Sequence, residues 1–469
     1  MSAGAEPRGR GAGAEPRARG AGAEPRGRGA GAQPRGASVA PARACAYAVI
    51  RRVFEQGAWA DRALHGEARR RGLDARDLAL ATRLSFGTVQ RAATLDHVIG
   101  TLARRAPAKL DAPILAALRL GVFQLAFLDR VPAHAAVAEA VELAKHDAPR
   151  GPKLVNAVLR RAAREARALI DALPETTPQE AALKHSHPTW IAELWFDALG
   201  APDARALMAA NNEPSEAVLR ANTLKTTPAE LAARLPVVQD GDALILQQPF
   251  DAFGAPEWEQ GLFMPQSRAA MAVARIVDPQ PGERVLDLCA APGGKTTHLA
   301  ALMRNEGEIT AVERHPGRAD ALRRTAQRMG ATIVDVLTQD ATQSQGTTFD
   351  RVLVDPPCSD LGTLASRPDA RWRKAGRPQE LAPLQARILA AGAGAVRPGG
   401  TLVYSTCTIS PAENERVVAA FLAAHDDFTV DELRQEAPVW KHPSMPQYLQ
   451  TLPHRDRTDG FFIARLNRA

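Results

Sequence analysis

The stretch RVLDLCAAPGGKTTHLA (284–300) decides the fold of the C-terminal part of this chain. It reads as a short Val/Leu-rich strand, RVLDL (284–288), then a turn at Gly293 and Gly294 and the start of a helix. Four more apolar strands follow, each bounded by turn or helix signals: EITAVER (308–314), ATIVDVL (331–337), DRVLVD (350–355) and GTLVYST (400–406). Strands that alternate with helices in this way form a parallel sheet covered on both faces. We therefore predict a doubly wound, Rossmann-like α/β domain over 281–469, with GFFIARL (460–466) as an edge strand.

Three regions precede this domain. Residues 39–170 carry apolar side chains at helical spacing in one segment after another, for example in ARACAYAVIRRVFEQG, which stops at Gly57. They predict an all-helical domain. Residues 171–280 mix helix and strand patterns and predict a small α+β linker domain. Residues 1–38 repeat the unit GAEPRGRGA and offer almost no apolar surface to bury, so we predict a disordered Arg/Gly-rich tail.

Length and composition limit the function classes. A chain of 469 residues is too long for one ordinary core, so several domains are expected. The net charge of +7 suits a polyanionic partner, although a generic basic surface explains it equally well. The sequence contains neither an apolar run of membrane length nor a signal-peptide h-region. We therefore expect a cytoplasmic protein with no membrane contact, and we separately expect a monomer.

The chain has four cysteines: Cys45, Cys289, Cys358 and Cys407. None belongs to a CxxC pair, which argues against a zinc site and a disulfide framework and for a reducing compartment. We expect no metal.

The turn after the first strand predicts a cofactor pocket, because doubly wound sheets bind ligands beyond the carboxyl ends of their strands. AAPGGKT resembles a nucleotide-triphosphate loop, but Cys289 stands where that loop needs glycine, and no GxGxxG occurs. Glu313, Asp340 and Asp355 follow the next three strands. Each alone could be a loop carboxylate or a helix cap. Together they suit a ligand with ribose and adenine but no phosphate, which points to S-adenosylmethionine.

Two of the cysteines end strands, in DPPC (355–358) and STC (405–407). The first motif resembles the Asp-Pro-Pro-aromatic motif of enzymes that methylate exocyclic amines, but Cys358 replaces the aromatic ring that stacks on the base. Methylation of a pyrimidine at C5 needs instead a thiolate that adds to C6, and an acid such as Asp355 to contact N3. Two inert buried thiols are the alternative. The residues alone do not say which cysteine attacks.

Five motifs resemble the Nol1/Nop2/Sun family of RNA cytosine-C5 methyltransferases: LDLCAAPGGKTTHLA, VLVDPPCSDLGT, RWRK, LVYSTCTISPAENERVV and DGFFIARL. LRLGVFQLAFLDRVPAHAAVAEAVELAK and KLVNAVLRR, within 39–170, resemble the NusB-like RNA-binding domain. The combination, over 39–469, is similar to the bacterial RsmB/Sun/Fmu branch of that family, whose substrate is 16S rRNA. DPPC in place of the commoner DAPC, and Glu313 in place of Asp, are departures that keep the reactive groups.

The resemblance implies roles for individual residues. Cys407 would be the nucleophile, Cys358 would release the methylated base, and Asp355 would contact N3 of the base. The cofactor contacts it implies are Cys289, Ala290, Ala291, Pro292, Gly293, Gly294, Lys295, Glu313, Asp340 and Asp355. A cytosine-C5 methyltransferase acting on tRNA or another rRNA site is one alternative. A non-catalytic RNA-binding or antitermination factor is another.

Overall fold

The N-terminal part of the chain is helical. The computed structural model describes residues 39–469, apart from 344–345, 347, 374–375 and 434–439, so the predicted disorder of 1–38 lies outside the described residues. The first elements are α1 (Pro41–Gln56), α2 (Ala60–Arg71), α3 (Ala75–Gln90), α4 (Ala92–Ala103), the 3-10 turn η1 (Pro107–Lys109), α5 (Ala112–Phe127), α6 (Ala133–Asp147) and α7 (Pro152–Asp171). As predicted, α1 stops at Gly57, which adopts the left-handed conformation with φ 65°.

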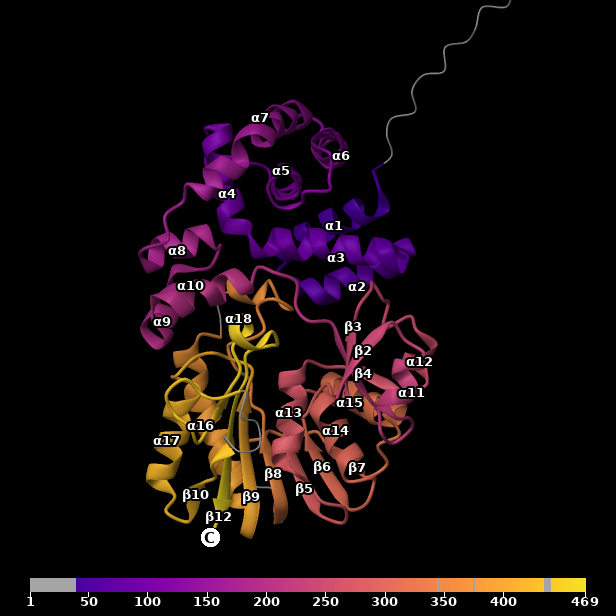
Figure 1. The fold of residues 1–469 in the computed structure, drawn as a ribbon, viewed down its shortest axis with the longest axis vertical. Coiled ribbons are helices and arrows are strands. Elements are labelled where there is room, and N and C mark those ends of the chain that lie inside the picture. The colour runs from indigo at the N-terminus through magenta and orange to yellow at the C-terminus, as the bar shows by residue number, and fades with distance from the viewer. Residues whose placement is uncertain (1–38, 344–345, 347, 374–375, 434–439) are drawn as a thin grey trace, which may run out of the picture. The chain divides into compact units, whose positions relative to one another are not determined.

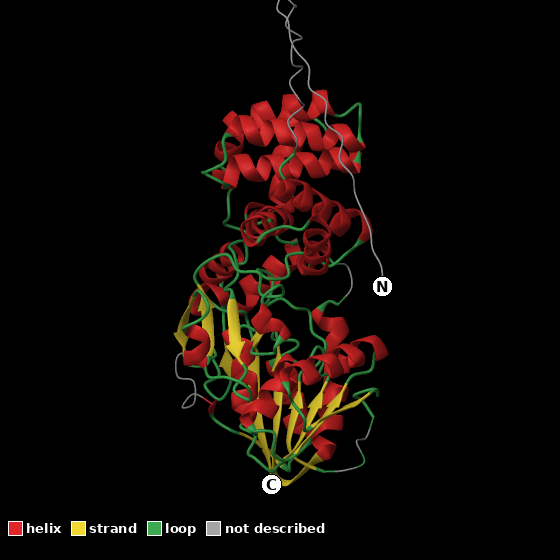
Figure 2. Ribbon diagram, turned by 90° about the vertical axis from the view of Figure 1, so that its right-hand side faces the viewer, coloured by secondary structure: helices red, strands yellow, loops and turns green. Residues whose placement is uncertain are grey.

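Helix α5 is the centre of this helical part, because nearly every face of it is buried. Leu118, Val122 and Phe123 are fully inaccessible to solvent. Gly121 lies so close to α7 that a Cβ atom there would come within 2.6 Å of Leu159. The prediction of an all-helical domain is confirmed (Figures 1 and 2).

The middle of the chain combines helices with a small antiparallel sheet. Its elements are α8 (Pro178–Lys184), α9 (Thr189–Leu199), α10 (Ala201–Ala210), β1 (Val218–Ala221), α11 (Pro228–Ala232), β2 (Val237–Asp240), β3 (Ala243–Leu246), α12 (Pro256–Glu259) and β4 (Phe263–Pro265). The strand order is β2-β3-β1-β4, and all neighbours are antiparallel. The expected α+β character is therefore present.

The C-terminal part is a mixed sheet with helices on both faces. Its strands are β5 (Arg284–Leu288), β6 (Glu308–Val312), β7 (Val334–Leu337), β8 (Phe349–Val354), β9 (Val396–Thr406), β10 (Phe428–Val430), β11 (Leu449–Gln450) and β12 (Phe462–Arg468). Its helices are α13 (Arg268–Val277), α14 (Gly294–Leu302), α15 (Pro316–Met329), the 3-10 turn η2 (Ala370–Trp372), α16 (Pro378–Ala395), α17 (Glu415–Ala424) and α18 (Pro453–Asp456).

The strands follow the order β10-β12-β9-β8-β5-β6-β7, with β11 beside β12. Strands β5 to β9 are parallel, as predicted, and β12 runs antiparallel to β9. The prediction that 460–466 forms an edge strand is wrong. Strand β12 lies between β9 and β10, because the three-residue strand β10 covers its outer side.

Alternate residues of the central strands face opposite helical layers. Leu286 and Val352 pack with α16 and α17 on one face. Val285 and Leu353 pack with α13 and α14 on the other. The chain leaves β5 for β6 on one side and returns to β8 on the other, so the strand order reverses between β5 and β8. Ligands of such sheets bind beyond the carboxyl ends of the strands at this point.

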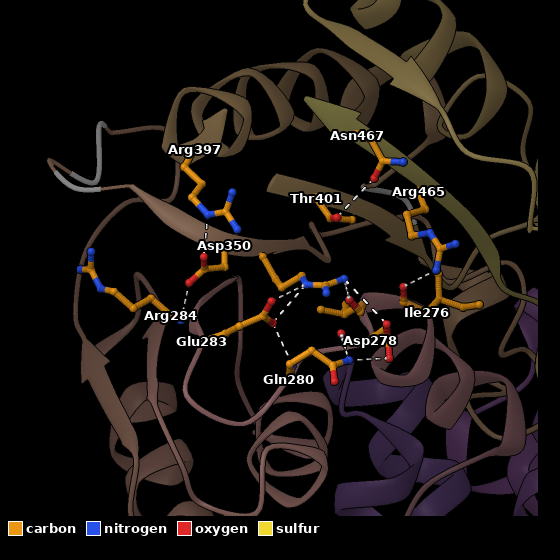
Figure 3. A network of polar contacts seen from close by, with 12 residues as sticks. Ile276, Asp278, Gln280, Glu283, Arg284, Asp350, Arg397, Thr401, Arg465 and Asn467 are labelled. Carbon is orange, nitrogen blue, oxygen red and sulfur yellow. Dashed lines mark hydrogen bonds and ion pairs between the residues drawn. The ribbon is translucent and has the colours of Figure 1, made fainter. Parts of the chain in front are cut away.

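The amino ends of the same strands are closed by charged side chains (Figure 3). Asp350 accepts hydrogen bonds from the Arg284 backbone N at 2.8 Å and from Arg397 Nε at 2.6 Å. Glu283 pairs with Arg351 at 3.1 Å. This network joins the starts of β5, β8 and β9. The carboxyl ends of these strands lie at the opposite edge of the sheet, where the candidate site lies.

Among the described residues, no helix combines the length and the apolar character that crossing a membrane requires.

Candidate active site

The loop after β5 turns back beside the end of β6. Cys289 (φ 67°) and Gly293 (φ 103°) both adopt left-handed conformations. The φ of Gly293 would strain any other residue, and a Cβ atom there would also come within 2.6 Å of Leu322. The Ala290 N–H bonds to the Val312 carbonyl at 3.0 Å. Helix α14 begins at Gly294, so the predicted stretch Cys289–Lys295 forms a tight cradle with a helix N-terminus in it.

Two predicted acids follow β6 and β7. Glu313 is buried, with 3% of its surface exposed; its Oε1 accepts from the His315 N–H at 2.8 Å, and its Oε2 lies 3.3 Å from Arg318 Nε. Asp340 Oδ1 accepts from the Thr342 N–H at 2.9 Å and from its hydroxyl at 2.8 Å. These bonds from Thr342 lower the pKa of Asp340. Glu313 is thus buried and held by two contacts, whereas Asp340 is only partly buried.

Lys295 and Asp355 form an ion pair between α14 and the end of β8. Lys295 Nζ lies 2.7 Å from Asp355 Oδ2, and the Ser405 hydroxyl donates to Asp355 Oδ1 at 3.3 Å. Burial alone would lower the pKa of Lys295, but the charge and the hydrogen bond of Asp355 outweigh it and raise that pKa. The ammonium therefore stays charged and holds the carboxylate in place.

Asp287, near the end of β5, is a buried acid that sequence reasoning did not single out. Its Oδ2 accepts from the Thr296 hydroxyl at 2.6 Å. Its Oδ1 is buried and has no hydrogen-bond partner among the described residues. Burial raises the pKa of Asp287 to about 7. A polar atom left unpaired beside the cradle is one that a bound ligand or water can satisfy.

The two strand-end cysteines meet. Strands β8 and β9 are parallel neighbours, and the Sγ atoms of Cys358 and Cys407 lie 3.3 Å apart. Both thiols are free and partly accessible. The hydrogen bond with Cys358, burial, and the charges of Cys358, Asp360 and Asp355 raise the pKa of Cys407 well above its ordinary value. The resting thiol is therefore protonated at neutral pH.

Asp360 is a second acid that sequence reasoning missed, although it stands in the quoted motif. Its Oδ1 lies 3.1 Å from Cys407 Sγ and 3.9 Å from Cys358 Sγ. Its Oδ2 lies 3.3 Å from Arg367 Nη1. The ligand atoms of these two thiols and this carboxylate all lie within 4.8 Å of one another, close enough to hold an ion. The absence of a metal therefore stays a prediction.

Glu413 anchors the loop that carries Cys358. Its carboxylate accepts from the Ser359 N–H at 2.9 Å and from Gln385 Nε2 at 2.9 Å. Tyr404 donates to the Glu413 carbonyl at 2.6 Å. The loop after β8 is thus bonded to the end of β9 and to α16, which fixes one thiol relative to the other.

Arg371, from the RWRK motif, joins the same loop to the helical part. It is 1% exposed. Its guanidinium donates to the carbonyls of Gln90, Ser186, Asn211 and Leu364 and to the Asn212 side chain at 2.8–3.3 Å. Trp372 Nε1 donates to the Val89 carbonyl at 2.7 Å. Lys374 of the motif lies outside the described residues.

Two protein-family models together match most of the sequence. The model described as "16S rRNA methyltransferase RsmB/F" matches residues 274–467, and the NusB family model matches 40–164. A third model, a ferredoxin-like domain described as "Methyltr_RsmF/B-like", matches 187–251.

Relatives match over nearly their whole length. "Probable ribosomal RNA small subunit methyltransferase B" of Synechocystis sp. is 36% identical over 91% of this chain and 99% of its own. A protein of the same name from Bacillus subtilis is 37% identical, over 83% and 90%. "Ribosomal RNA small subunit methyltransferase B" of Vibrio cholerae is 36% identical, over 84% and 90%.

Solved structures share the fold. "Crystal Structure of PH0851" matches with a TM-score of 0.79 and 28% identity, covering 92% of this chain and 99% of the other. NSun6 from Pyrococcus horikoshii with SFG matches with a TM-score of 0.55 at 22% identity, covering 60% of this chain and 98% of the other, which shows similarity of fold alone.

Proposed function

We propose that this chain, which belongs to the 16S rRNA methyltransferase RsmB/F family, transfers a methyl group from S-adenosylmethionine to C5 of a cytosine in 16S rRNA. The observation that carries the proposal is the pair of thiols 3.3 Å apart beyond the carboxyl ends of β8 and β9. C5 of cytosine is a poor nucleophile until a thiolate has added to C6. Both sulfur atoms lie beyond the carboxyl ends of the strands, where sheets of this type bind their ligands.

The residues around the cradle fit the cofactor. The cofactor set is Cys289, Ala290, Ala291, Pro292, Gly293, Gly294, Lys295, Glu313, Asp340 and Asp355. Its carboxylates only accept hydrogen bonds when ionised, which suits ribose hydroxyls and an adenine amino group and disfavours phosphate. The tight turn at Gly293 and the unpaired Asp287 Oδ1 leave polar backbone and side-chain groups for a ligand. Bound there, S-adenosylmethionine supplies the methyl electrophile.

The roles of the reacting groups follow the resemblance of the motifs. Cys407 attacks C6 and Cys358 assists release of the methylated base. Asp355, held by Lys295 at 2.7 Å, contacts N3 of the cytosine. Because N3 is an acceptor, Asp355 makes C6 more electrophilic as the carboxylic acid, which donates its proton to N3. The contact with Lys295 supports this role by keeping the Asp355 side chain oriented.

We assign RNA binding to the helical part of the chain. Residues 39–170, which contain the NusB match, would hold the RNA, while 171–280 link them to the catalytic residues 281–469. The bonds of Arg371 to Gln90 and Leu364 support joint action of the helical part and the catalytic loop. A purely RNA-binding factor would not need two facing thiols and an intact cofactor cradle. We take the protein to be a cytoplasmic monomer.

Bisulfite mapping tests the proposal. In cells that lack the gene, one cytosine of 16S rRNA should lose its 5-methyl mark, and the purified protein with S-adenosylmethionine should restore it. Loss of a mark in tRNA or in other rRNA instead would change the substrate. Loss of no mark in any RNA would contradict the function.

A further inference from the structure

Asp360 turns back from the loop after β8 toward the thiol that follows β9. Its φ of 58° lies in the left-handed region, which Asp tolerates better than most residues with a side chain. The turn is fixed, because Thr363 donates through its backbone N and through its hydroxyl to the Asp360 carbonyl, at 3.0 Å each. The residues that follow are held against the end of β9, because the Gly362 N–H donates to the Cys407 carbonyl at 3.0 Å.

The two oxygens of Asp360 have different partners. Oδ1 lies 3.1 Å from Cys407 Sγ, and Oδ2 lies 3.3 Å from the Arg367 guanidinium. The Asp360 side chain is 20% exposed. One oxygen is thus held by a cation while the other faces the sulfur.

Two other acids close to the thiols are already bonded to other groups. Asp355 is bonded to Lys295 and Ser405 through its two oxygens. The Glu413 carboxylate is bonded to Ser359, Gln385 and Thr408. Among the described residues, Asp360 is therefore the carboxylate in hydrogen-bonding contact with the Cys407 thiol.

We propose that Asp360 is a catalytic residue: its carboxylate takes the proton of the Cys407 thiol as the sulfur attacks, and returns it as the sulfur leaves. The assignment rests on the covalent cysteine chemistry proposed above.

The transfer balances over the cycle. The Cys407 S–H bond breaks as the Sγ–C6 bond forms, and the proton moves to Asp360 Oδ1. The C5=C6 electron pair becomes available at C5, which forms its bond to the methyl group. The bond between that methyl group and the sulfonium sulfur of S-adenosylmethionine breaks, and S-adenosylhomocysteine is the leaving group. In the release step that Cys358 assists, the C5 proton passes to solvent water and its electron pair restores C5=C6. The Sγ–C6 pair returns to sulfur, which recovers the proton from Asp360.

A negative charge beside a thiol has two opposite effects, and these separate a proton acceptor from a structural residue. It makes the isolated thiolate harder to form, so its removal should lower the pKa of Cys407. It also receives the proton during attack, so its removal should slow turnover.

Asp360→Asn in the full chain tests the proposal, with a chelator present. Methyl transfer to the substrate RNA should fall by about 10²- to 10⁴-fold. Alkylation of Cys407 by iodoacetamide at a pH below 9 should become about tenfold faster, as measured by peptide mass spectrometry. Asp360→Gly, which suits the positive φ, should behave in the same way. Asp426→Asn, at an exposed acid beyond α17, should leave both rates unchanged, and thermal unfolding checks that each variant is folded.

The outcomes are distinguishable. Wild-type turnover in Asp360→Asn or Asp360→Gly overturns the assignment, and so does a parallel fall of turnover and alkylation, which indicates a loop-shaping role. If wild type forms no 5-methylcytosine, or Cys407→Ala still forms it, the proposed function itself fails. The alkylation rates then still report whether Asp360 acts on the thiol.

Discussion

Cys358 and Cys407 stand 49 residues apart in the chain, yet their sulfur atoms lie 3.3 Å from each other. Parallel pairing of β8 with β9 causes this, because parallel neighbours bring their carboxyl ends to one edge of the sheet. Because the two thiols are in contact, the roles proposed for them can be separated only by changing one cysteine at a time.

Substitution of the two cysteines should give opposite phenotypes. Cys407→Ala removes the attacking sulfur, so methyl transfer should fall by about 10³-fold or more and no RNA should attach covalently. Cys358→Ala should still attach but not release, leaving a protein–RNA adduct that survives denaturing electrophoresis. Cys45→Ala, at a buried thiol in α1, is the control and should act normally. Identical behaviour of the two variants, or exchanged roles, would contradict the assignment.

Glu313 should govern affinity for the cofactor. Glu313→Gln keeps the shape of the side chain but removes the charge that accepts ribose hydroxyls, so the Kd for S-adenosylmethionine should rise about tenfold. Isothermal titration calorimetry measures this. Glu308→Gln, at the exposed start of the same strand β6, provides the matched control and should bind normally. Equal affinities of wild type and Glu313→Gln would remove Glu313 from the cofactor site.

Arg371 should hold the catalytic loop to the helical part. Arg371→Met leaves several buried carbonyl oxygens without a donor, which should lower the free energy of unfolding by about 2–4 kcal/mol. Chemical denaturation measures this loss, and methyl transfer should fall with it because the loop also carries Cys358. Arg416→Met, at an exposed position in α17, should change neither quantity. Normal stability of Arg371→Met would show that water or other groups satisfy these carbonyls.

The sequence predicted the central strands better than the edges of the sheet. Strand β5 spans the predicted 284–288, because its apolar run is bounded by clear turn signals. Strand β9 begins at Val396, four residues before its prediction. The Pro398–Gly400 segment reads as a turn, and in the structure it is an irregularity between the pairs Val396–Phe349 and Thr401–Arg351. Strand β10 has three residues, too few for any periodicity to show, and its omission produced the wrong edge assignment of β12.

The residues of the candidate site also differ in whether the sequence could predict them. Residues that end strands, such as Glu313 and Cys407, were predicted because parallel topology alone gathers them. The contact of Asp360 with Cys407 depends on a left-handed turn that sequence spacing does not encode. The Arg371 contacts join segments more than 150 residues apart, which only the packed structure shows.

Asp287 should make stability depend on pH in a narrow window. Its pKa is about 7 in the folded protein against 3.8 in the unfolded chain. Between these values the folded state binds a proton that the unfolded state has lost. The free energy of unfolding therefore falls as pH rises, by at most about 1.4 kcal/mol per unit, and levels off above pH 7.

A second buried acid allows an internal control for this slope. Burial raises the pKa of Asp459 from 3.8 to about 6. Its contribution to the free energy of unfolding therefore falls as the pH rises toward 6 and changes little above pH 6. Urea denaturation of the cofactor-free protein at pH 5, 6, 7 and 8 should show a flatter curve between pH 6 and 7 for Asp287→Asn than for wild type. Asp459→Asn should flatten the curve below pH 6 and keep the slope above it. A curve for Asp287→Asn parallel to wild type across pH 6–7 would mean that Asp287 is ionised in the folded protein, with its unpaired oxygen solvated.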